Sequence, residues 1–335
     1  MTVSFIIPFF WSCKHPSNLP VIRESTAMNT YVTATVYDSD AKPDSVNSWI
    51  DSVFAEIRRV EEMATDYNDT SQVGRINAGA GVESVMVSVE LIDLLGQALH
   101  YGDVSGHAFD VAVGPIVKAW DFLSPNPHSP SKERIERLLP LINSELIAIV
   151  GNRVFLKKRG MGIDLGGIAK GYAVDRAVQI LRRGGYNKFI IDIGGNLGVY
   201  WEGTHILDST IAEILIRHPR KDGEFFGRFM MGTGGVSTSG DYQRFFVENG
   251  VRYHHIIDPS TGYPVRGVVS VTIVAQDAIS ADAISTLVFV LGREQGMEFI
   301  KNSPGIDGMI VYESRDSLVY DLSPGFQRRF VRTQP

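Results

Sequence analysis

The chain has 335 residues, of which 44% are hydrophobic and 21% are charged, and its formal net charge is −6. These values are typical of a water-soluble globular protein with one large domain or two modest ones. The acidic balance, with no basic stripe, argues against a nucleic-acid-binding protein. The single cysteine, Cys13, excludes an internal disulfide framework.

The N-terminal segment, residues 1–25, differs from the rest in composition. Val3–Trp11 is an apolar run interrupted by Pro8; it is too short to span a bilayer, and no Lys or Arg precedes it. Ser12, Cys13 and a polar stretch follow, a pattern similar to a shortened bacterial lipoprotein signal. We therefore expect a periplasmic protein, attached to the inner membrane through lipidated Cys13. A disordered N-terminus of a cytoplasmic protein is the alternative.

The first half of the sequence mixes strand and helix patterns. Tyr31–Tyr37 is rich in β-branched and aromatic residues and predicts a strand. Three prolines make Ser124–Pro130 a loop. Apolar residues at helical spacing predict helices over residues 43–63, Ser88–Tyr101 and Lys132–Leu138.

Strands dominate the second half. Those predicted are Ala148–Val150, Val154–Leu156, Phe189–Ile193, Ile211–Arg217, Val268–Ala275 and Met309–Tyr312. Two predicted helices, Ile168–Arg183 and Ala281–Leu291, interrupt them. Because helices and strands mix without a strict βαβ rhythm, we expect an α+β fold. It would be a single compact domain over residues 26–330, with mixed or antiparallel sheets flanked by helices.

The stretch Gly162–Asp175 is the most informative part of the sequence. Its pattern predicts a buried apolar strand, a tight turn at Gly166 and Gly167, and then the start of a helix. A helix N-terminus presents free N–H groups and a positive dipole end, which favour a phosphate, and Lys170 adds a positive charge. An ordinary strand-to-helix corner is the alternative interpretation.

The stretch Ser280–Thr286 brings oxygen atoms to one helix face. Asp282 and Thr286 are four residues apart, and Ser285 is three residues from Asp282. One carboxylate with hydroxyl oxygens suits a hard cation, and Mg²⁺ takes one or two carboxylates together with substrate phosphates. A helix-capping role for Asp282 is the alternative.

Three further segments carry side chains that suit chemistry. His255 precedes a predicted β-turn at Asp258–Gly262 and is a candidate general base, with a structural histidine as the alternative. Gly235–Tyr242 is predicted as a loop that would present hydroxyl groups. Phe109 and Asp110 place an aromatic ring beside a carboxylate. No dinucleotide-binding fingerprint and no P-loop is present in the sequence.

Taken together and in this order, these segments resemble the FAD:protein FMN transferase (ApbE) family. The matching segments are Ala27–Thr30, Gly74–Asn77, Gly106–Pro115, Gly162–Asp175, Ile191–Asn196, Ser237–Asp241, His255–Pro259 and Ala281–Thr286. The resemblance implies a fold related to the T-fold, with a flavin cleft between two lobes. It implies an Mg²⁺-dependent enzyme that cleaves FAD and releases AMP. The FMN half would be attached through a phosphoester bond to a Thr or Ser of a flavoprotein in an electron-transport complex.

The resemblance also implies roles for single residues. Those implied for FAD binding are Met28, Ala108, Phe109, Asp110, Asp164, Lys170 and Ile257. Those implied for Mg²⁺ are the Gly167 carbonyl, Asp282 and Thr286, with Ser285 adjacent. His255 is similar in position to the histidine proposed as the base for the acceptor hydroxyl, and Asp258 is a second candidate. Two positions depart from the family pattern: Asn29 stands where glycine is usual, and Ser285 where some members carry a second Asp.

Two other functions are compatible with the sequence. An FAD pyrophosphatase would use water in place of the hydroxyl and give FMN and AMP. A flavin-binding lipoprotein would hold FAD without turnover. The pair Asp282 and Thr286 favours an enzyme, because binding alone does not require a metal ion at the diphosphate.

Overall fold

The computed structural model describes residues 19–37, 43–202, 211–315 and 317–333 of the chain. The apolar run and Cys13 lie outside these residues. Strand β1 (Val21–Ala27) begins inside the segment that the sequence analysis separates from the domain, so residues 21–25 belong to the fold. Their side chains alternate between half-buried and exposed, which is the pattern of a strand with one covered face.

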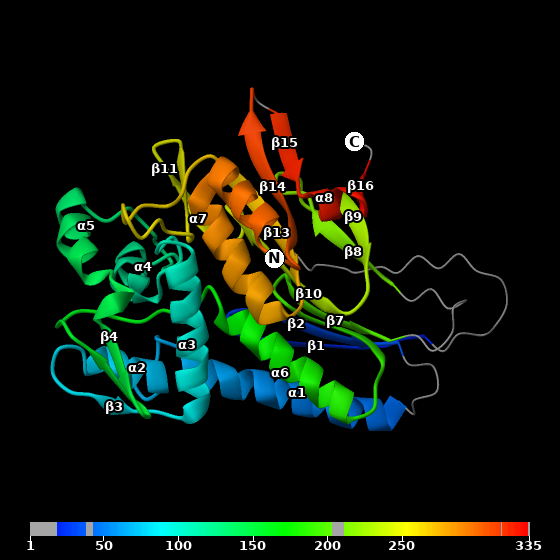
Figure 1. The fold of residues 1–335 in the computed structure, drawn as a ribbon, viewed down its shortest axis with the longest axis horizontal. Helices are drawn as coiled ribbons and strands as arrows, with labels where there is room; N and C mark the ends of the chain where they lie inside the picture. Colours follow the sequence, from blue (N-terminus) through cyan, green and yellow to red (C-terminus); the bar gives the residue numbers. More distant parts are fainter. Residues whose placement is uncertain (1–18, 38–42, 203–210, 316, 334–335) are drawn as a thin grey trace.

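An eight-stranded antiparallel sheet forms the centre of the fold (Figure 1). Its strands, in spatial order, are β1, β2 (Thr30–Val36), β6 (Lys188–Ile193), β7 (Asn196–Trp201), β10 (Gly234–Gly240), β13 (Val268–Ala275), β14 (Asp307–Ser314) and β15 (Ser317–Leu322). Every residue of β13 is buried, because both faces of the sheet are covered at its centre.

Three long helices cover one face of this sheet: α1 (Pro43–Ala64), α6 (Ala169–Arg183) and α7 (Ala278–Asn302) (Figure 1). Helix α6 contacts both α1 and α7. Ile50 of α1 and Val174 of α6 lie in one core with Ile191 of β6. No helix in the described ranges is both long and apolar enough to cross a bilayer.

The opposite face packs against a second core. Ile190, which neighbours Ile191 in β6, lies in this core with Ile214 and Phe229, as expected for side chains that alternate across a strand. This core lies under a small sheet of β8 (Ala212–Arg217), β9 (Phe225–Met231) and β16 (Phe330–Arg332), with α8 (Pro324–Gln327) nearby.

The remaining elements form the end of the molecule where α3 and α5 lie (Figure 1). They are α2 (Gln72–Ala78), α3 (Val89–Val104), α4 (Gly114–Trp120), α5 (Lys132–Leu138), the sheet of β3 (Val85–Met86), β5 (Arg153–Leu156) and β4 (Ile147–Val150), and the hairpin of β11 (Phe245–Glu248) and β12 (Val251–His254). A third core joins α4, α5 and this hairpin around the buried ring of Trp120.

The structure corrects three predicted elements. Gly162–Leu165 is not a strand: it has no regular secondary structure, and its Ile163 backbone bonds to the Asn77 amide. The predicted loop at Gly235–Tyr242 is largely strand β10, in the middle of the main sheet. Helix α7 continues past the predicted end at Leu291, through a break at Gly292, where φ is 80°.

Candidate active site

A cavity of about 980 Å³ lies where the main sheet meets the loop before α6, the start of α7 and the segment after β12. Sequence-predicted site residues that line it are Met28, Ala108, Phe109, Asp110, Asp164, Gly167, Lys170, His255, Ile257, Asp282 and Thr286. Asp258 and Ser285 do not line the cavity. The fold therefore gathers segments that are more than two hundred residues apart in the sequence.

Met28 reaches the cavity from the turn between β1 and β2. Met28 and Asn29 both have positive φ, 53° and 56°, between the paired residues Ala27 and Thr30. This geometry is that of a two-residue type I′ hairpin turn, and Asn tolerates it better than most residues. Asn29 can therefore stand where the family pattern has glycine. A methionine in this conformation is strained, by about 1–3 kcal/mol.

Phe109 and Asp110 sit at the cavity wall after the turn that ends α3. Phe109 is buried, and its ring lies 6.4 Å from that of Tyr101. The Asp110 carboxylate accepts hydrogen bonds from the Ala112 N–H at 2.7 Å and from the Ser144 N–H at 3.1 Å. These bonds fix the loop that carries Phe109 and Ala108, so Asp110 shapes the cavity wall through its backbone contacts.

The glycine turn before α6 lies against α7. A side-chain carbon added at Gly167 would come within 2.9 Å of the Phe109 ring and 3.4 Å of the Thr286 hydroxyl oxygen. Lys170, in the first turn of α6, donates to the Gly166 carbonyl at 3.0 Å, and its ammonium nitrogen lies 3.7 Å from Asp282 Oδ1. Only glycine at position 167 leaves the backbone this close to both neighbours.

Asp282 is a buried carboxylate directed at the start of α6. Its side chain is 4% exposed, and Oδ2 accepts a hydrogen bond from the Gly171 N–H at 2.9 Å. Asp277, not Asp282, caps α7 by accepting from the Ser280 N–H at 2.9 Å. The capping interpretation of Asp282 is therefore wrong. The positive end of α6 already holds this carboxylate, and burial raises its pKa while Lys170 opposes that rise.

The residues at this point fit a magnesium ion. Asp282 and Thr286 lie one helical turn apart on α7, both line the cavity, and Gly167 is adjacent to Thr286. The donors are all oxygen atoms, which Mg²⁺ prefers. Within the described ranges, no three His, Cys, Asp or Glu side chains gather around one point. A single carboxylate binds Mg²⁺ weakly, so ligand phosphates would complete this site.

The resemblance implies that Ser285 is adjacent to the metal ligands, but its side chain does not line the cavity. It is fully buried, and its hydroxyl bonds to the hydroxyls of Ser237 at 3.0 Å and Ser239 at 2.8 Å. It also donates to the Asp282 carbonyl at 3.0 Å. Because these contacts use the whole bonding capacity of one hydroxyl, Ser285 ties α7 to β10 behind the cavity and supports Asp282.

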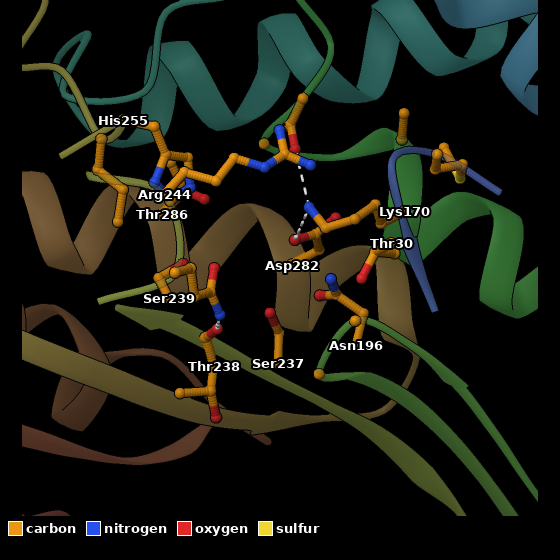
Figure 2. Close-up of a pocket in the computed structure, with 18 of the residues that line it drawn as sticks. Thr30, Lys170, Asn196, Ser237, Thr238, Ser239, Arg244, His255, Asp282 and Thr286 are labelled. Carbon is orange, nitrogen blue, oxygen red and sulfur yellow. Dashed lines mark hydrogen bonds and ion pairs between the residues drawn. The ribbon is translucent and has the colours of Figure 1, made fainter. Parts of the chain in front are cut away.

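Of the two adjacent histidines, His254 is structural and His255 faces the cavity (Figure 2). The His254 ring contacts the Val265 carbonyl at 2.8 Å, whereas His255 Nδ1 is buried without a hydrogen-bond partner in the described part of the chain. Burial, followed by the nearby Arg244 guanidinium, lowers the pKa of His255 to about 3. The imidazole of the free protein is thus neutral at physiological pH.

Asp258 does not face the cavity. Its carboxylate accepts from the Ser260 N–H at 2.8 Å and the Ser260 hydroxyl at 2.7 Å, and its carbonyl accepts from the Gly262 N–H at 2.8 Å. The predicted β-turn is confirmed, and Asp258 belongs to it. The preceding residue, Ile257, is buried and lines the cavity.

Two neighbouring carboxylates, Asp164 and Asp66, lie on another part of the cavity wall. Asp164 accepts from the Gly166 N–H at 2.6 Å. Burial, followed by the neighbouring Asp66 carboxylate, raises the pKa of Asp164 to about 6. Asp66 is 7% exposed and lies 3.5 Å from the Lys118 ammonium nitrogen. Asp164 therefore changes its protonation close to physiological pH.

Some polar residues that line the cavity are absent from the sequence-based site. Among them are Asp66, Asn196 and Arg244. Asn196 stands in the matched segment Ile191–Asn196, and Arg244 follows the matched segment Ser237–Asp241 closely. The family motifs therefore indicate the part of the sequence in which these two residues lie. Asp66 has no such signal, because only the end of α1 brings it to the cavity.

The cavity thus brings oxygen donors, a lysine and a buried imidazole to one place, a combination that suits a ligand with phosphate groups. The chain belongs to the ApbE family, whose sequence model matches residues 28–310.

Relatives and solved structures agree with this assignment. A Klebsiella pneumoniae protein named FAD:protein FMN transferase is 34% identical over 271 residues, which cover 80% of this chain and 83% of the relative. A Treponema pallidum protein of the same name is 32% identical over 307 residues, which cover 88% and 84%. The ApbE protein of Thermotoga maritima has a TM-score of 0.83 at 33% identity, and the match covers 92% of this chain and 98% of that one. The flavin transferase ApbE of Vibrio cholerae has a TM-score of 0.81 at 25% identity, with 92% and 99% covered. The predicted α+β fold and family are confirmed.

Proposed function

We propose that this protein is an Mg²⁺-dependent FAD:protein FMN transferase, which attaches FMN to a Thr or Ser of a target flavoprotein and releases AMP. The names of its relatives support flavin transfer from FAD to a protein. The observation that carries the proposal is the convergence of Lys170, Asp282, Thr286 and His255 in one cavity. Each has a distinct use in phosphoryl transfer.

The reaction balances without an oxidant or reductant. The acceptor hydroxyl oxygen bonds to the phosphorus of the FMN half, and the bond from that phosphorus to the bridging oxygen breaks. The electron pair leaves with the AMP phosphate. Lys170 lies beside Asp282 and offsets negative charge on the diphosphate. Asp282, Thr286 and the Gly167 carbonyl would hold Mg²⁺, which stabilises charge on the phosphate oxygens when bound.

The neutral His255 ring is suited to accept the hydroxyl proton. Its Nδ1 has no hydrogen-bond partner among the described residues, and burial, followed by the cationic Arg244, keeps the pKa of the ring low before the ligand binds. An anionic diphosphate in the cavity raises the pKa of the imidazole, because a nearby negative charge favours its protonated form. The base therefore gains strength when FAD is present.

We further propose that the acceptor is a flavoprotein of an electron-transport complex and that transfer takes place in the periplasm. The lipoprotein-like sequence around Cys13 supports this location. Membrane fractionation of cells that carry the full chain or its Cys13→Ala variant tests it. We expect the full chain in the membrane fraction and the variant in the soluble periplasmic fraction. Equal distribution of the two contradicts lipid attachment.

Intact-protein mass spectrometry of an acceptor flavoprotein tests the activity. With FAD and Mg²⁺, we expect a mass gain equal to one attached FMN and an equal amount of AMP. An acceptor whose modified Thr is replaced by Ala is the matched control. Free FMN and AMP at the same rate with and without the acceptor would instead identify an FAD pyrophosphatase. FAD that stays intact with Mg²⁺ would identify a flavin-binding protein without turnover.

A further inference from the structure

Asn196 is a buried amide with an unused oxygen. It is 3% exposed, and its Oδ1 has no hydrogen-bond partner among the described residues. Its amide nitrogen makes one long contact, 3.4 Å to the Ile193 carbonyl. An unsatisfied buried polar atom costs about 1–3 kcal/mol. Such an atom in a native protein needs an explanation, and a ligand group is one.

The position of Asn196 places this amide at the candidate active site. It pairs with Ser237 across β7 and β10, so the two side chains share one face of the sheet. Ser237 bonds to Ser285, which in turn bonds to the Asp282 backbone. Figure 2 shows the amide of Asn196 directed toward Asp282 and Lys170, and Asn196 lines the cavity.

The backbone before Asn196 is held in a fixed turn. Gly194 and Gly195 have φ of 60° and 92°, and the Asp192 carboxylate accepts from the Gly195 N–H at 2.8 Å. A side-chain carbon at Gly194 would lie 2.5 Å from the Thr30 hydroxyl oxygen, so the turn packs against β2. The amide is therefore presented from a rigid corner of the cavity wall, as a ligand-recognition residue requires.

The chemistry of the free atom limits its partner. A carbonyl oxygen only accepts hydrogen bonds, and an ionised diphosphate has no proton to donate. On the proposed function, Lys170 and Asp282 mark the diphosphate of FAD. That diphosphate is flanked by the ribityl chain on one side and by the adenosine ribose on the other, and both carry hydroxyl groups. We propose that Asn196 accepts a hydrogen bond from a sugar hydroxyl next to the diphosphate and so helps to select the ligand.

A titration of the full chain with FAD tests this role. Flavin fluorescence measures the binding, and EDTA prevents metal-dependent turnover during the titration. The variant is Asn196→Ala, and Asn126→Ala, at an exposed loop position outside the cavity, is the matched control. We expect Asn196→Ala to weaken FAD binding about threefold to tenfold, which is the range for one hydrogen bond. Its melting temperature should stay level or rise, because the free protein loses an unsatisfied oxygen. The control should bind as the wild type does.

Two FAD analogues identify the hydroxyl, one lacking a ribityl hydroxyl and one with deoxyribose at the adenosine end. The wild type should bind one of them about threefold to tenfold less tightly than FAD, and Asn196→Ala should bind that analogue and FAD equally. The analogue that the wild type binds less tightly shows whether the hydroxyl belongs to the ribityl chain or to the adenosine ribose.

Three results would overturn the inference. The first is an unchanged FAD affinity in Asn196→Ala. The second is that Asn196→Ala binds FAD and both analogues more weakly than the wild type does, by the same factor for all three ligands. The third is a loss of FAD affinity in Asn196→Ala that occurs only when Mg²⁺ is added. The last result would place Asn196 at the metal ion. If the wild type binds FAD but transfers no FMN, the proposed function is wrong. The hydrogen bond to Asn196 can still be measured in that case, because the test depends on binding alone.

Discussion

Gly171 is the point at which α6 touches α7, and its replacement tests the packing that positions the site. A side-chain carbon at Gly171 would lie 2.3 Å from the Ala278 carbonyl oxygen and 2.7 Å from Asp282 Cβ. The first contact is with helix backbone, which cannot rotate away as a long side chain can. In Gly171→Ala the two helices must separate, and the 2.9 Å bond from the Gly171 N–H to Asp282 must lengthen.

The size of the effect follows from three contributions. Overpacking costs about 1–3 kcal/mol. Loss of a buried hydrogen bond to a carboxylate adds about 1.5 kcal/mol or more. The better helix propensity of alanine returns up to about 1 kcal/mol. We therefore expect Gly171→Ala to lower the free energy of unfolding by about 2–3 kcal/mol and the melting temperature by roughly 4–8 °C.

Thermal melting and FAD titration of two glycine variants give the test. Gly96→Ala is the matched control, because Gly96 is exposed in α3 and an added carbon there meets nothing within 4 Å. We expect this control to gain up to about 1 kcal/mol and to keep its FAD affinity. Gly171→Ala should lose both stability and affinity. A Gly171→Ala protein that melts like the control, or that binds FAD normally, would refute the role of this contact.

Four further predictions concern single side chains. Asp282→Asn keeps an acceptor for the α6 N–H but removes the charge, so Mg²⁺-dependent turnover should fall at least about 100-fold while thermal melting stays level or rises. Lys170→Met should weaken FAD binding about tenfold in calorimetric titration. Melting should change less than binding, because the Lys170 side chain is partly exposed and its ammonium nitrogen contacts the Gly166 carbonyl at 3.0 Å and Asp282 only at 3.7 Å. His255→Gln should lower the transfer rate by a larger factor than it lowers the FAD affinity, and a transfer rate equal to that of the wild type would contradict a role as the base. The hydrogen bond from Arg59 lowers the pKa of Glu56 to about 2. Glu56 therefore stabilises the fold fully at pH values above its unfolded pKa of about 4.3. This contribution to the free energy of unfolding is lost as the pH falls toward 2. Urea unfolding should show Glu56→Gln to be less stable by about 1–3 kcal/mol at pH 7, with a difference that shrinks below pH 4.

Elements with a strong hydrophobic period could be predicted from the sequence. The helix Lys132–Leu138 and the strand Val268–Ala275 have the predicted bounds, and α1 ends one residue beyond its prediction. In α1 most of the apolar residues that recur at helical spacing are buried, whereas in Val268–Ala275 a continuous, largely β-branched run is buried on both faces of the sheet. Local composition is enough there, because burial on one or both faces determines the pattern.

Strand β10 could not be predicted in this way. Its small and hydroxyl residues carry no period, and they form a strand because α7 packs closely over them. A side-chain carbon at Gly235 would lie 2.2 Å from the Asp277 backbone. Small residues are thus required by a tertiary contact between segments more than thirty residues apart, which the local sequence does not contain.

In the site, too, some features could be predicted from the local sequence and others depend on tertiary contacts. The sequence motifs supply Asp282, Lys170 and His255, and the structure brings all three to the cavity. Their motifs do not tell which way a neighbouring side chain points: Ser285 faces β10, although it lies three residues from Asp282. Asn196 reaches the site because the register of β7 places it opposite Ser237. That register depends on the whole sheet.

A crystal structure of the protein with FAD and Mn²⁺, in which anomalous scattering locates the metal ion, tests the central claim most directly. We expect the ion between Asp282 and Thr286, with the diphosphate of FAD beside Lys170 in the same cavity. A metal ion at another position, or FAD bound outside the cavity, would contradict the account.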